Sequence, residues 1–265
     1  MRNVFLSFLF VVCAWGSLAK ADETIQFTSK NTIALRSEVN GDSVAKFVDD
    51  FYKNTSNPLY VYIDSPGGSV IDGFKIIEAI KNDKSRKIVC VANTAASMAF
   101  SILQACPVRY VTDHSIVMQH VGSYGIQGQS PNNVTMLDFA ERMFKRMSQD
   151  DAKRLGLTYA AFRAKIRDDW WMFSDEAVGF KAADGTAQVS CSKELTDKRV
   201  VQKFYTLFGT FTVTFSGCPI ASDPLKIEMK ETTAVVDRVN DEQVVKFIDK
   251  LYPRKALLDR LYIKD

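Results

Sequence analysis

The feature that most constrains this chain is a short apolar run that leads into a glycine-rich loop and then into an amphipathic helix. The run is Leu59 to Ile63, the loop is Asp-Ser-Pro-Gly-Gly-Ser at 64–69, and apolar residues recur at helical spacing from Ser69 to Asn82. A nearly continuous apolar strand is typical of a strand buried on both faces of a parallel sheet. The segment therefore predicts one strand–loop–helix unit of an α/β domain.

Similar units flank this one and complete the α/β rhythm. We expect strands at 32–35 and 87–92, helices at 41–53 and from near 97, helical segments at 132–153 and 158–167, and a final helix at 174–182. The long helix at 132–153 has an apolar side, which predicts burial in the core or in a subunit interface. That side consists of Met136, Phe139, Met143, Phe144 and Met147.

The first 21 residues have the pattern of a secretory signal peptide. Arg2 is followed by an apolar stretch from Val4 to Trp15, and Ala-Lys-Ala at 19–21 has the small residues of a cleavage site. The apolar stretch is shorter than the roughly 20 residues that a membrane-spanning helix needs. We therefore expect an exported protein, periplasmic or secreted, with no membrane span after cleavage.

Charge and cysteine content bear on the possible partners, disulfides and cofactors of this chain. Of the 34 basic residues, Arg2 and Lys20 lie in the leader, which leaves 32 against 31 acidic residues and gives no indication of a nucleic-acid partner. Cys13 also lies in the leader. Of the other four cysteines, Cys90 is expected to be a buried free thiol, and Cys191 and Cys218 are the preferred disulfide. No metal-ligand spacing is present, and we expect no cofactor.

The C-terminal part contains a partial internal repeat. Residues 32–52 and 232–252 align without a gap and share nine identities, among them Val44 with Val244 and Phe47 with Phe247. The repeat predicts a second strand–helix–strand unit that lacks the glycine loop. The expected organisation is a signal peptide at 1–21, a main domain at 22–190 and an extension at 191–265.

Ser97 and His120 are the candidate nucleophile and base of an acyl-transfer site. A serine hydroxyl needs a neighbouring base to remove its proton, and His120 is the preferred base because His114 is expected in a turn after Asp113. A carboxylate must orient the imidazole, and Asp168 and Asp169 are the candidates. Gly67, Gly68 and the amide of Met98 could form an oxyanion hole, because glycine allows close backbone approach and a helix N-terminus favours negative charge.

Five motifs in order resemble the proteolytic subunit of the Clp protease family: SPGGSV, AASMA, MQHVG, GIQGQ and DDWWMFSDEAV. The resemblance covers about residues 32–189. It implies a crotonase-like α/β spiral and a Ser-His-Asp serine endopeptidase that acts on peptides or unfolded proteins. The matching positions are Ser97 as nucleophile, His120 as base and Asp169, with Asp168 as the alternative. Gly68 and Met98 match the oxyanion-hole amides.

The resemblance also implies a homo-oligomer, which could be a ring. In the family, rings of subunits stack through a region that matches the strand at 124–129 and the long helix after it. Two departures matter. The leader replaces the segment that engages an ATPase in cytosolic members, which argues against an ATPase partner. Val121-Gly122 replaces the usual Gln-Pro after the histidine, in a substrate groove that also includes Gly67.

Two other functions and one other catalytic mechanism compete with the Ser-His-Asp peptidase. The partial duplication motivates a catalytically silent assembly or binding module on the same fold. A Ser-Lys mechanism would need Lys145 or Lys153 to reach Ser97. Acyl-CoA chemistry of the crotonase type does not require a serine at this helix start. The α/β hydrolase elbow, G-x-S-x-G, is absent around Ser97.

Overall fold

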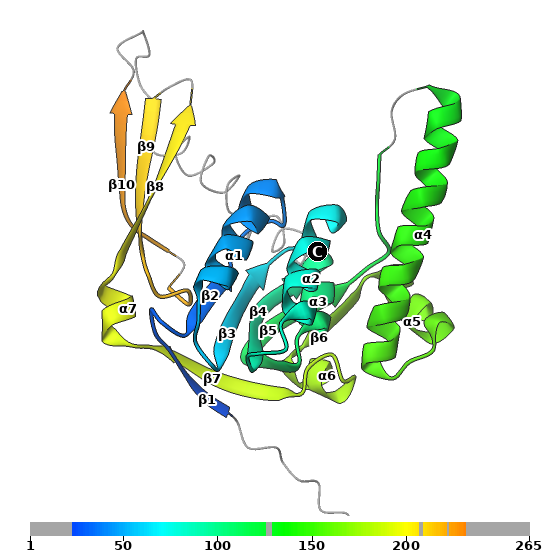
Figure 1. The fold of residues 1–265 in the computed structure, drawn as a ribbon, viewed down its shortest axis with the longest axis horizontal. Helices are drawn as coiled ribbons and strands as arrows, with labels where there is room; N and C mark the ends of the chain where they lie inside the picture. The colour runs from blue at the N-terminus through cyan, green and yellow to red at the C-terminus, as the bar shows by residue number, and fades with distance from the viewer. Residues whose placement is uncertain (1–22, 126–128, 207–208, 222, 232–265) are drawn as a thin grey trace, which may run out of the picture.

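The structure is a computed structural model that describes residues 23–125, 129–206, 209–221 and 223–231. Its centre is a seven-stranded, mainly parallel sheet with helices packed on it (Figure 1). The expected signal peptide and the repeat at 232–252 lie outside the described residues. Among the described residues, every helix is too short or too polar to span a lipid bilayer.

The main sheet has the strand order β1-β7-β5-β4-β3-β2, and β6 pairs antiparallel with β5. Its strands are β1 (Glu23–Phe27), β2 (Thr32–Leu35), β3 (Leu59–Ser65), β4 (Ile88–Ala96), β5 (Val108–Gln119), β6 (Trp170–Phe173) and β7 (Gly185–Cys191). The helices are α1 (Gly41–Lys53), α2 (Val70–Asn82), α3 (Met98–Ala105), α4 (Ser130–Leu155), α5 (Tyr159–Lys165), the short η1 (Ile166–Asp168) and α6 (Ser174–Gly179). The predicted α/β architecture is confirmed.

Local sequence explains where the first elements begin and end. Strand β2 and helix α1 have the predicted bounds, and the Asn40 side chain caps α1 by accepting from the amides of Asp42 and Ser43. Ser69, expected as the first residue of the second helix, is instead the N-cap of α2 and accepts from the amide of Asp72. Such caps satisfy amides that have no partner within the helix.

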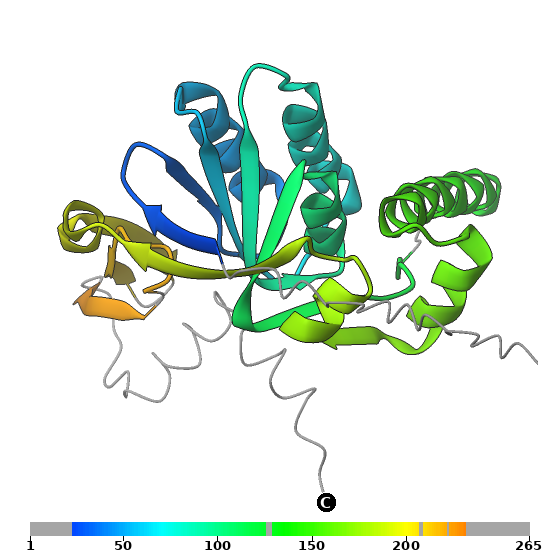
Figure 2. The same cartoon turned by 90° about the horizontal axis from the view of Figure 1, so that it is seen from below.

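Strand β3 is buried on both faces, as its apolar run predicts. Leu59, Val61 and Ile63 face the core under α1, α2 and α3, whereas Tyr62 faces a second core with Phe27 of β1. The ring centroids of Phe27 and Tyr62 are 5.7 Å apart. The sheet therefore curls, and its strands β1 and β7 pack against the face of β3 and β4 that is opposite the helices (Figure 2).

Two disulfides are present, and one contradicts the sequence prediction. The expected Cys191–Cys218 bond is confirmed and links the end of β7 to the chain after β9. Cys90 is not a free thiol: it is bonded to Cys106, the C-cap of α3. The prediction was wrong because alternation in β4 directs Cys90 toward the helical layer, where α3 ends.

The turn expected at Asp113–His114 is also wrong. Both residues belong to the continuous strand β5, although they are exposed. The pairing of β5 with β4 shifts there, because Ala92 pairs with Val111 whereas Thr94 pairs with Ile116. The sequence signal for a turn therefore corresponds to a bulge, and β5 continues to the edge of the sheet where His120 follows.

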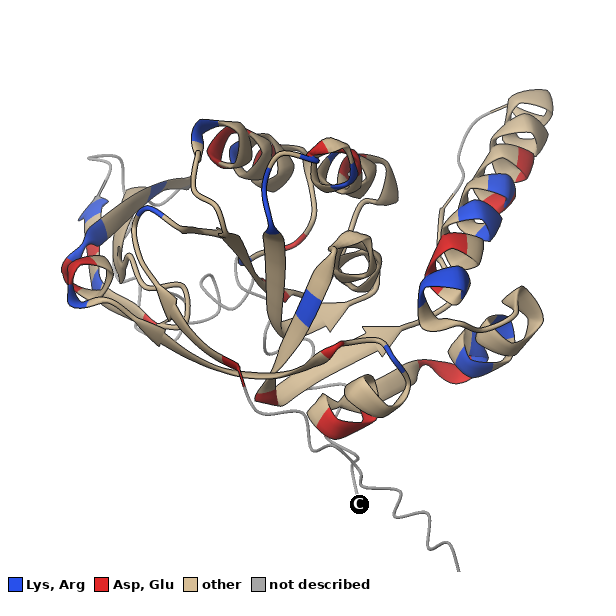
Figure 3. Cartoon of the chain, turned by 60° about the horizontal axis from the view of Figure 1, so that its bottom comes forward, with Lys and Arg blue, Asp and Glu red and all other residues tan. Residues whose placement is uncertain are grey.

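Helix α4 extends away from the sheet, with α5 beside its C-terminal end (Figure 1). Met147 of its predicted apolar side is buried, but Met136 is 59% exposed and Phe139 is 51% exposed. Positive and negative residues are interspersed along α4 from Asp138 to Arg154, whereas the strands of the central sheet carry few charges (Figure 3). The N-terminal half of α4 thus leaves an apolar face uncovered within the described chain.

The described part of the extension after residue 190 begins inside β7 and continues as α7 (Lys193–Asp197). Strands β8 (Arg199–Thr206), β9 (Gly209–Ser216) and β10 (Pro224–Glu231) then form an antiparallel sheet on the opposite side of the molecule from α4 (Figure 1). This second sheet was not among the sequence predictions.

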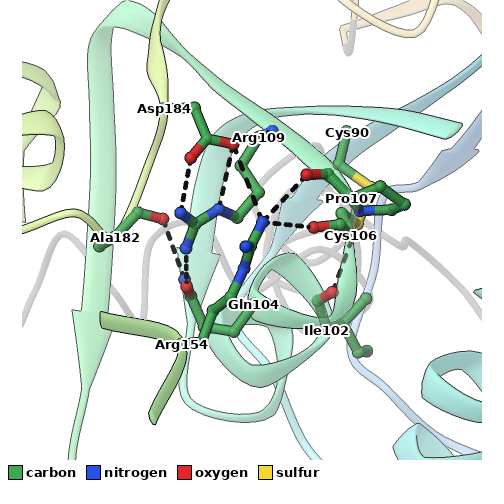
Figure 4. A network of polar contacts seen from close by, with 9 residues as sticks. All are labelled: Cys90, Ile102, Gln104, Cys106, Pro107, Arg109, Arg154, Ala182 and Asp184. Carbon is green, nitrogen blue, oxygen red and sulfur yellow. Dashed lines mark hydrogen bonds and ion pairs between the residues drawn. A yellow bond between two sulfur atoms is a disulfide. The ribbon is translucent and has the colours of Figure 1, made fainter. Parts of the chain in front are cut away.

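An ion pair between a buried arginine and a half-buried aspartate joins β5 to the loop before β7 (Figure 4). Arg109 is 3% exposed and binds both carboxylate oxygens of Asp184, while its guanidinium also contacts the Gln104 side chain. Burial raises the pKa of Asp184, but the hydrogen bonds and charge of Arg109 and the charge of Arg154 outweigh it and lower that pKa overall. The network fixes the C-terminal ends of α3 and α4 against the sheet, because Arg154 also donates to the carbonyl oxygens of Cys106 and Pro107.

Candidate active site

Ser97 occupies the junction between β4 and α3 in a strained conformation. Its φ of 55° and ψ of −121° lie in a region that residues with a side chain rarely adopt. The Ser97 amide donates to the Met118 carbonyl oxygen at 2.9 Å, and the Ser97 hydroxyl does not cap the helix that it precedes. Such strain is often found at functional residues whose surroundings hold them in place. The Ser97 hydroxyl is thus available to hydrogen-bond a side chain from a neighbouring strand.

His120 provides the partner of that hydroxyl. Its Nε2 atom lies 2.8 Å from Ser97 Oγ, within the range of a nucleophile–base hydrogen bond. The contact follows from parallel pairing, because Ala96 of β4 is opposite Met118 of β5 and both strands end at the same edge. Both residues are half-buried. The structure therefore brings together the two side chains that the sequence placed 23 positions apart.

Asp169 lies near His120 in register but forms no hydrogen bond with it in the described chain. The antiparallel pairing of β5 with β6 ends at Gln119 opposite Trp170, so His120 and Asp169 are each one position beyond the last pair. Asp169 is exposed and has a φ of 53°. Asp168, the alternative, is also exposed and pairs with Arg167 at 2.9 Å. The carboxylate that would orient the imidazole stays a prediction.

The glycine loop lies directly against the Ser97 backbone. Val39 bridges the loop: its amide donates to the Gly67 carbonyl oxygen and its carbonyl oxygen accepts from the Ser69 amide, both at 2.7 Å. In a parallel bridge of this kind the amide of the intervening residue, Gly68, is directed away from Val39. Met98 is the first residue of α3, so its amide has no partner within the helix. These two amides are the donors expected for an oxyanion hole.

The substitution Gly67→Ala tests how closely this loop packs. A Cβ atom at Gly67 would lie 2.5 Å from the Ala96 carbonyl oxygen and 2.7 Å from both Met98 N and Ser97 Cβ, and the φ of 91° is unfavourable for alanine. We expect the loop to move and the rate of acylation of Ser97 to fall by a factor of about 10² or more, the usual effect of losing one oxyanion donor.

The measurement is the rate of Ser97 labelling by a fluorophosphonate in the folded variant. Gly41→Ala is the matched control, because nothing lies within 4 Å of a Cβ atom at Gly41. A Gly67→Ala protein that is labelled at the wild-type rate would show that the loop does not shape the site.

The segment after His120 passes over α4 and is the expected substrate groove. Val121 is 37% exposed, and a Cβ atom at Gly122 would collide with the Phe144 ring, so any larger residue there would have to displace that ring. The Phe144 ring stacks on Tyr124 with centroids 5.8 Å apart. The strand expected from Tyr124 is not formed at 124–125, and residues 126–128 lie outside the described part.

Three buried polar residues beside His120 were not identified from the sequence. Asp151 of α4 accepts hydrogen bonds from Ser101 Oγ at 2.7 Å and from Gln119 Nε2 at 3.2 Å. Burial raises the pKa of Asp151 to about 7, although the hydrogen bonds from Ser101 and Gln119 oppose the rise. One sequence signal was present: Asp151 is four residues after Met147, on the apolar side of the predicted helix.

Neither lysine of the Ser-Lys alternative contacts Ser97 within the described chain. Lys145 and Lys153 are both exposed residues of α4. The side-chain partner of Ser97 in the described chain is His120. The geometry therefore favours the histidine as base.

Comparison with known proteins gives a consistent match to one family. The family model of Clp protease matches residues 18–188. The ATP-dependent Clp protease proteolytic subunit 1 of Chlamydia abortus is 34% identical over 139 residues, which are 50% of this chain and 71% of that protein. Subunit 2 of a Synechococcus species is 28% identical over 176 residues, 64% of this chain and 85% of that protein. Subunit 2 of Pseudomonas aeruginosa is 29% identical over 128 residues, 48% and 64% of the respective chains.

Proposed function

This chain belongs to the Clp protease family and is a serine peptidase, and from this premise we propose that Ser97 and His120 hydrolyse peptides or unfolded proteins. The observation that carries the proposal is the 2.8 Å contact between Ser97 Oγ and His120 Nε2 beside the Gly67–Gly68 loop. A hydroxyl, a base within hydrogen-bond distance and free backbone amides are the parts that acyl transfer requires.

In the proposed reaction His120 Nε2 takes the proton of Ser97 as the hydroxyl oxygen attacks the peptide carbonyl carbon. The amides of Gly68 and Met98 stabilise the negative oxygen of the tetrahedral intermediate. His120 then donates its proton to the leaving amine, which leaves an acyl group on Ser97. A water molecule, deprotonated by His120, releases the acyl group by the same steps. Asp169 is the proposed carboxylate for His120 Nδ1.

We further propose that the protein acts as an exported homo-oligomer without an ATPase partner. Two disulfides support export, because such bonds persist in oxidising compartments. The relatives are named ATP-dependent proteases, but an exported chain has no supply of ATP. The exposed apolar residues Met136 and Phe139 on α4 support an assembly surface there.

Labelling with a fluorophosphonate tests the catalytic proposal. We expect one stoichiometric adduct, located on Ser97 by mass spectrometry of peptides, together with hydrolysis of casein or short fluorogenic peptides. Ser97→Ala should keep the fold and assembly and lose the adduct completely, because no other nucleophile replaces the hydroxyl. Ser123→Ala is the control, since Ser123 is an exposed serine close in sequence to His120.

Two other results would change the proposal. Labelling that persists in Ser97→Ala would exclude Ser97 as nucleophile. Defined oligomers without labelling or peptide turnover would support the alternative, a catalytically silent assembly or binding module.

Export is tested separately by alkylating thiols in whole cells before reduction: free Cys90 and Cys106 would contradict an oxidising location.

A further inference from the structure

A buried polar cluster connects α4 to both elements that carry the candidate catalytic pair. Its members are Ser101 of α3, Gln119 of β5 and Asp151 of α4, exposed by only 2%, 2% and 3%. The three side chains are mutually bonded: Asp151 Oδ2 accepts from Ser101 and Gln119, and Gln119 Nε2 also donates to Ser101 Oγ at 3.1 Å. We call these residues the Asp151 cluster.

The cluster reaches the base through a backbone contact. The Gln119 side-chain oxygen accepts from the His120 amide at 3.0 Å, so one side chain bonds both the cluster and the residue that carries the base. Ser101 lies one helical turn after Ser97. The cluster therefore spans the two strand–helix units whose relative position sets the 2.8 Å distance between Ser97 Oγ and His120 Nε2.

We propose that Asp151 is a positioning residue that fixes the orientation of the Gln119 amide and, through it, the main chain of His120. Asp151 Oδ2 accepts hydrogen bonds from both Ser101 and Gln119, so it selects the orientation in which Gln119 presents its NH₂ group to Asp151. That orientation places the Gln119 oxygen at the His120 amide. The reversed amide would oppose an NH₂ group to the His120 N–H and a carbonyl oxygen to Asp151 Oδ2, which already accepts from Ser101, and both contacts are repulsive.

An apolar side chain at position 151 would avoid the cost of burying a carboxyl group. It could fill the same space against α3, but it could not select the orientation of Gln119. The proposed role thus differs from simple packing and predicts a loss confined to the chemical step. The inference rests on the proposed function of Ser97 and His120.

The test compares Asp151→Leu, Asp151→Asn, Gln119→Leu and the double variant with leucine at both positions. Ser148→Ala is the control, because Ser148 is buried on the same helix and is not a member of the cluster. The measurements are the second-order rate of fluorophosphonate labelling, kcat and KM for a fluorogenic peptide, and the melting temperature of each protein.

We expect Asp151→Leu and Gln119→Leu each to lower the labelling rate and kcat by about 10- to 100-fold, as losses of supporting interactions do. KM should be unchanged, because the cluster does not line the expected groove. Asp151→Asn retains an acceptor oxygen and should stay within about 5-fold of wild type. The double variant should be no slower than the slower single variant, since both substitutions break the same chain of contacts.

Wild-type labelling rates in Asp151→Leu, or losses that multiply in the double variant, would overturn the proposal. If Asp151→Leu does not fold, Gln119→Leu decides, because an unchanged rate there shows that the contact to His120 has no role. These outcomes differ from failure of the proposed function, in which the wild-type protein itself carries no adduct on Ser97.

Discussion

Replacing His120 with alanine is expected to lower kcat for peptide hydrolysis by about 10⁴-fold or more while the fold is retained. The imidazole Nε2 atom, 2.8 Å from Ser97 Oγ, is the only group among the described residues that hydrogen-bonds the hydroxyl and could remove its proton. Without it the hydroxyl must attack as a neutral group, and the leaving amine has no acid to protonate it. The measurement is steady-state hydrolysis of a fluorogenic peptide across pH 5–9.

The chain has one other histidine, and it provides the matched control. His114 lies on the same strand β5 but is exposed, so His114→Ala should keep kcat within about 2-fold. The double variant Ser97→Ala/His120→Ala should be no slower than either single variant, because the two groups act as a unit. Full activity in His120→Ala would exclude this residue as the base.

Replacing Asp151 with asparagine is expected to raise the free energy of unfolding, relative to that of wild type, more at alkaline pH than at acidic pH. The cause is burial, which raises the pKa of this carboxyl from 3.8 to about 7. Between these values the folded protein binds a proton that the unfolded chain has lost, so stability falls as pH rises toward 7 and then becomes constant. At about 1.4 kcal/mol per pKa unit, the total change is about 4 kcal/mol.

The prediction is measured as the difference in unfolding free energy between Asp151→Asn and wild type, by urea denaturation with the disulfides intact. We expect this difference to shift in favour of the variant by more than about 2 kcal/mol between pH 5 and pH 8. Asp138→Asn is the control, since the Asp138 side chain lies on the same helix and is 66% exposed. Parallel pH profiles for wild type and Asp151→Asn would show that the carboxyl does not titrate in this range.

Local sequence was sufficient for the elements that begin and end on chemical signals. Strand β2 and helix α1 have the predicted bounds because Asn40 supplies a cap and the apolar stripe of α1 matches the helical period. The same reasoning failed at Asp113 and His114, where polar residues mark a bulge within β5. A bulge and a turn have similar composition, and only the partner strand distinguishes them.

The cysteines also show that local sequence cannot predict contacts that depend on a partner element. The sequence correctly predicts the bond between Cys191 and Cys218, but burial alone favours a free thiol at Cys90, which is in fact bonded. Its bond to Cys106 depends on which face of β4 meets the end of α3. That is a property of how the layers pack.

Short-range patterns in the sequence are enough to predict the α/β class, the order of the elements and the chemical groups at the site: a serine at a helix start, a histidine after a strand and a glycine loop. These follow from periodicity, capping and residue chemistry, which act over a few positions. The folded chain is needed to see that Ser97 Oγ and His120 Nε2 lie 2.8 Å apart and that Asp151 is buried near them. Both depend on strand register and on the packing of α4, and such contacts join residues too far apart in sequence for any local pattern to specify.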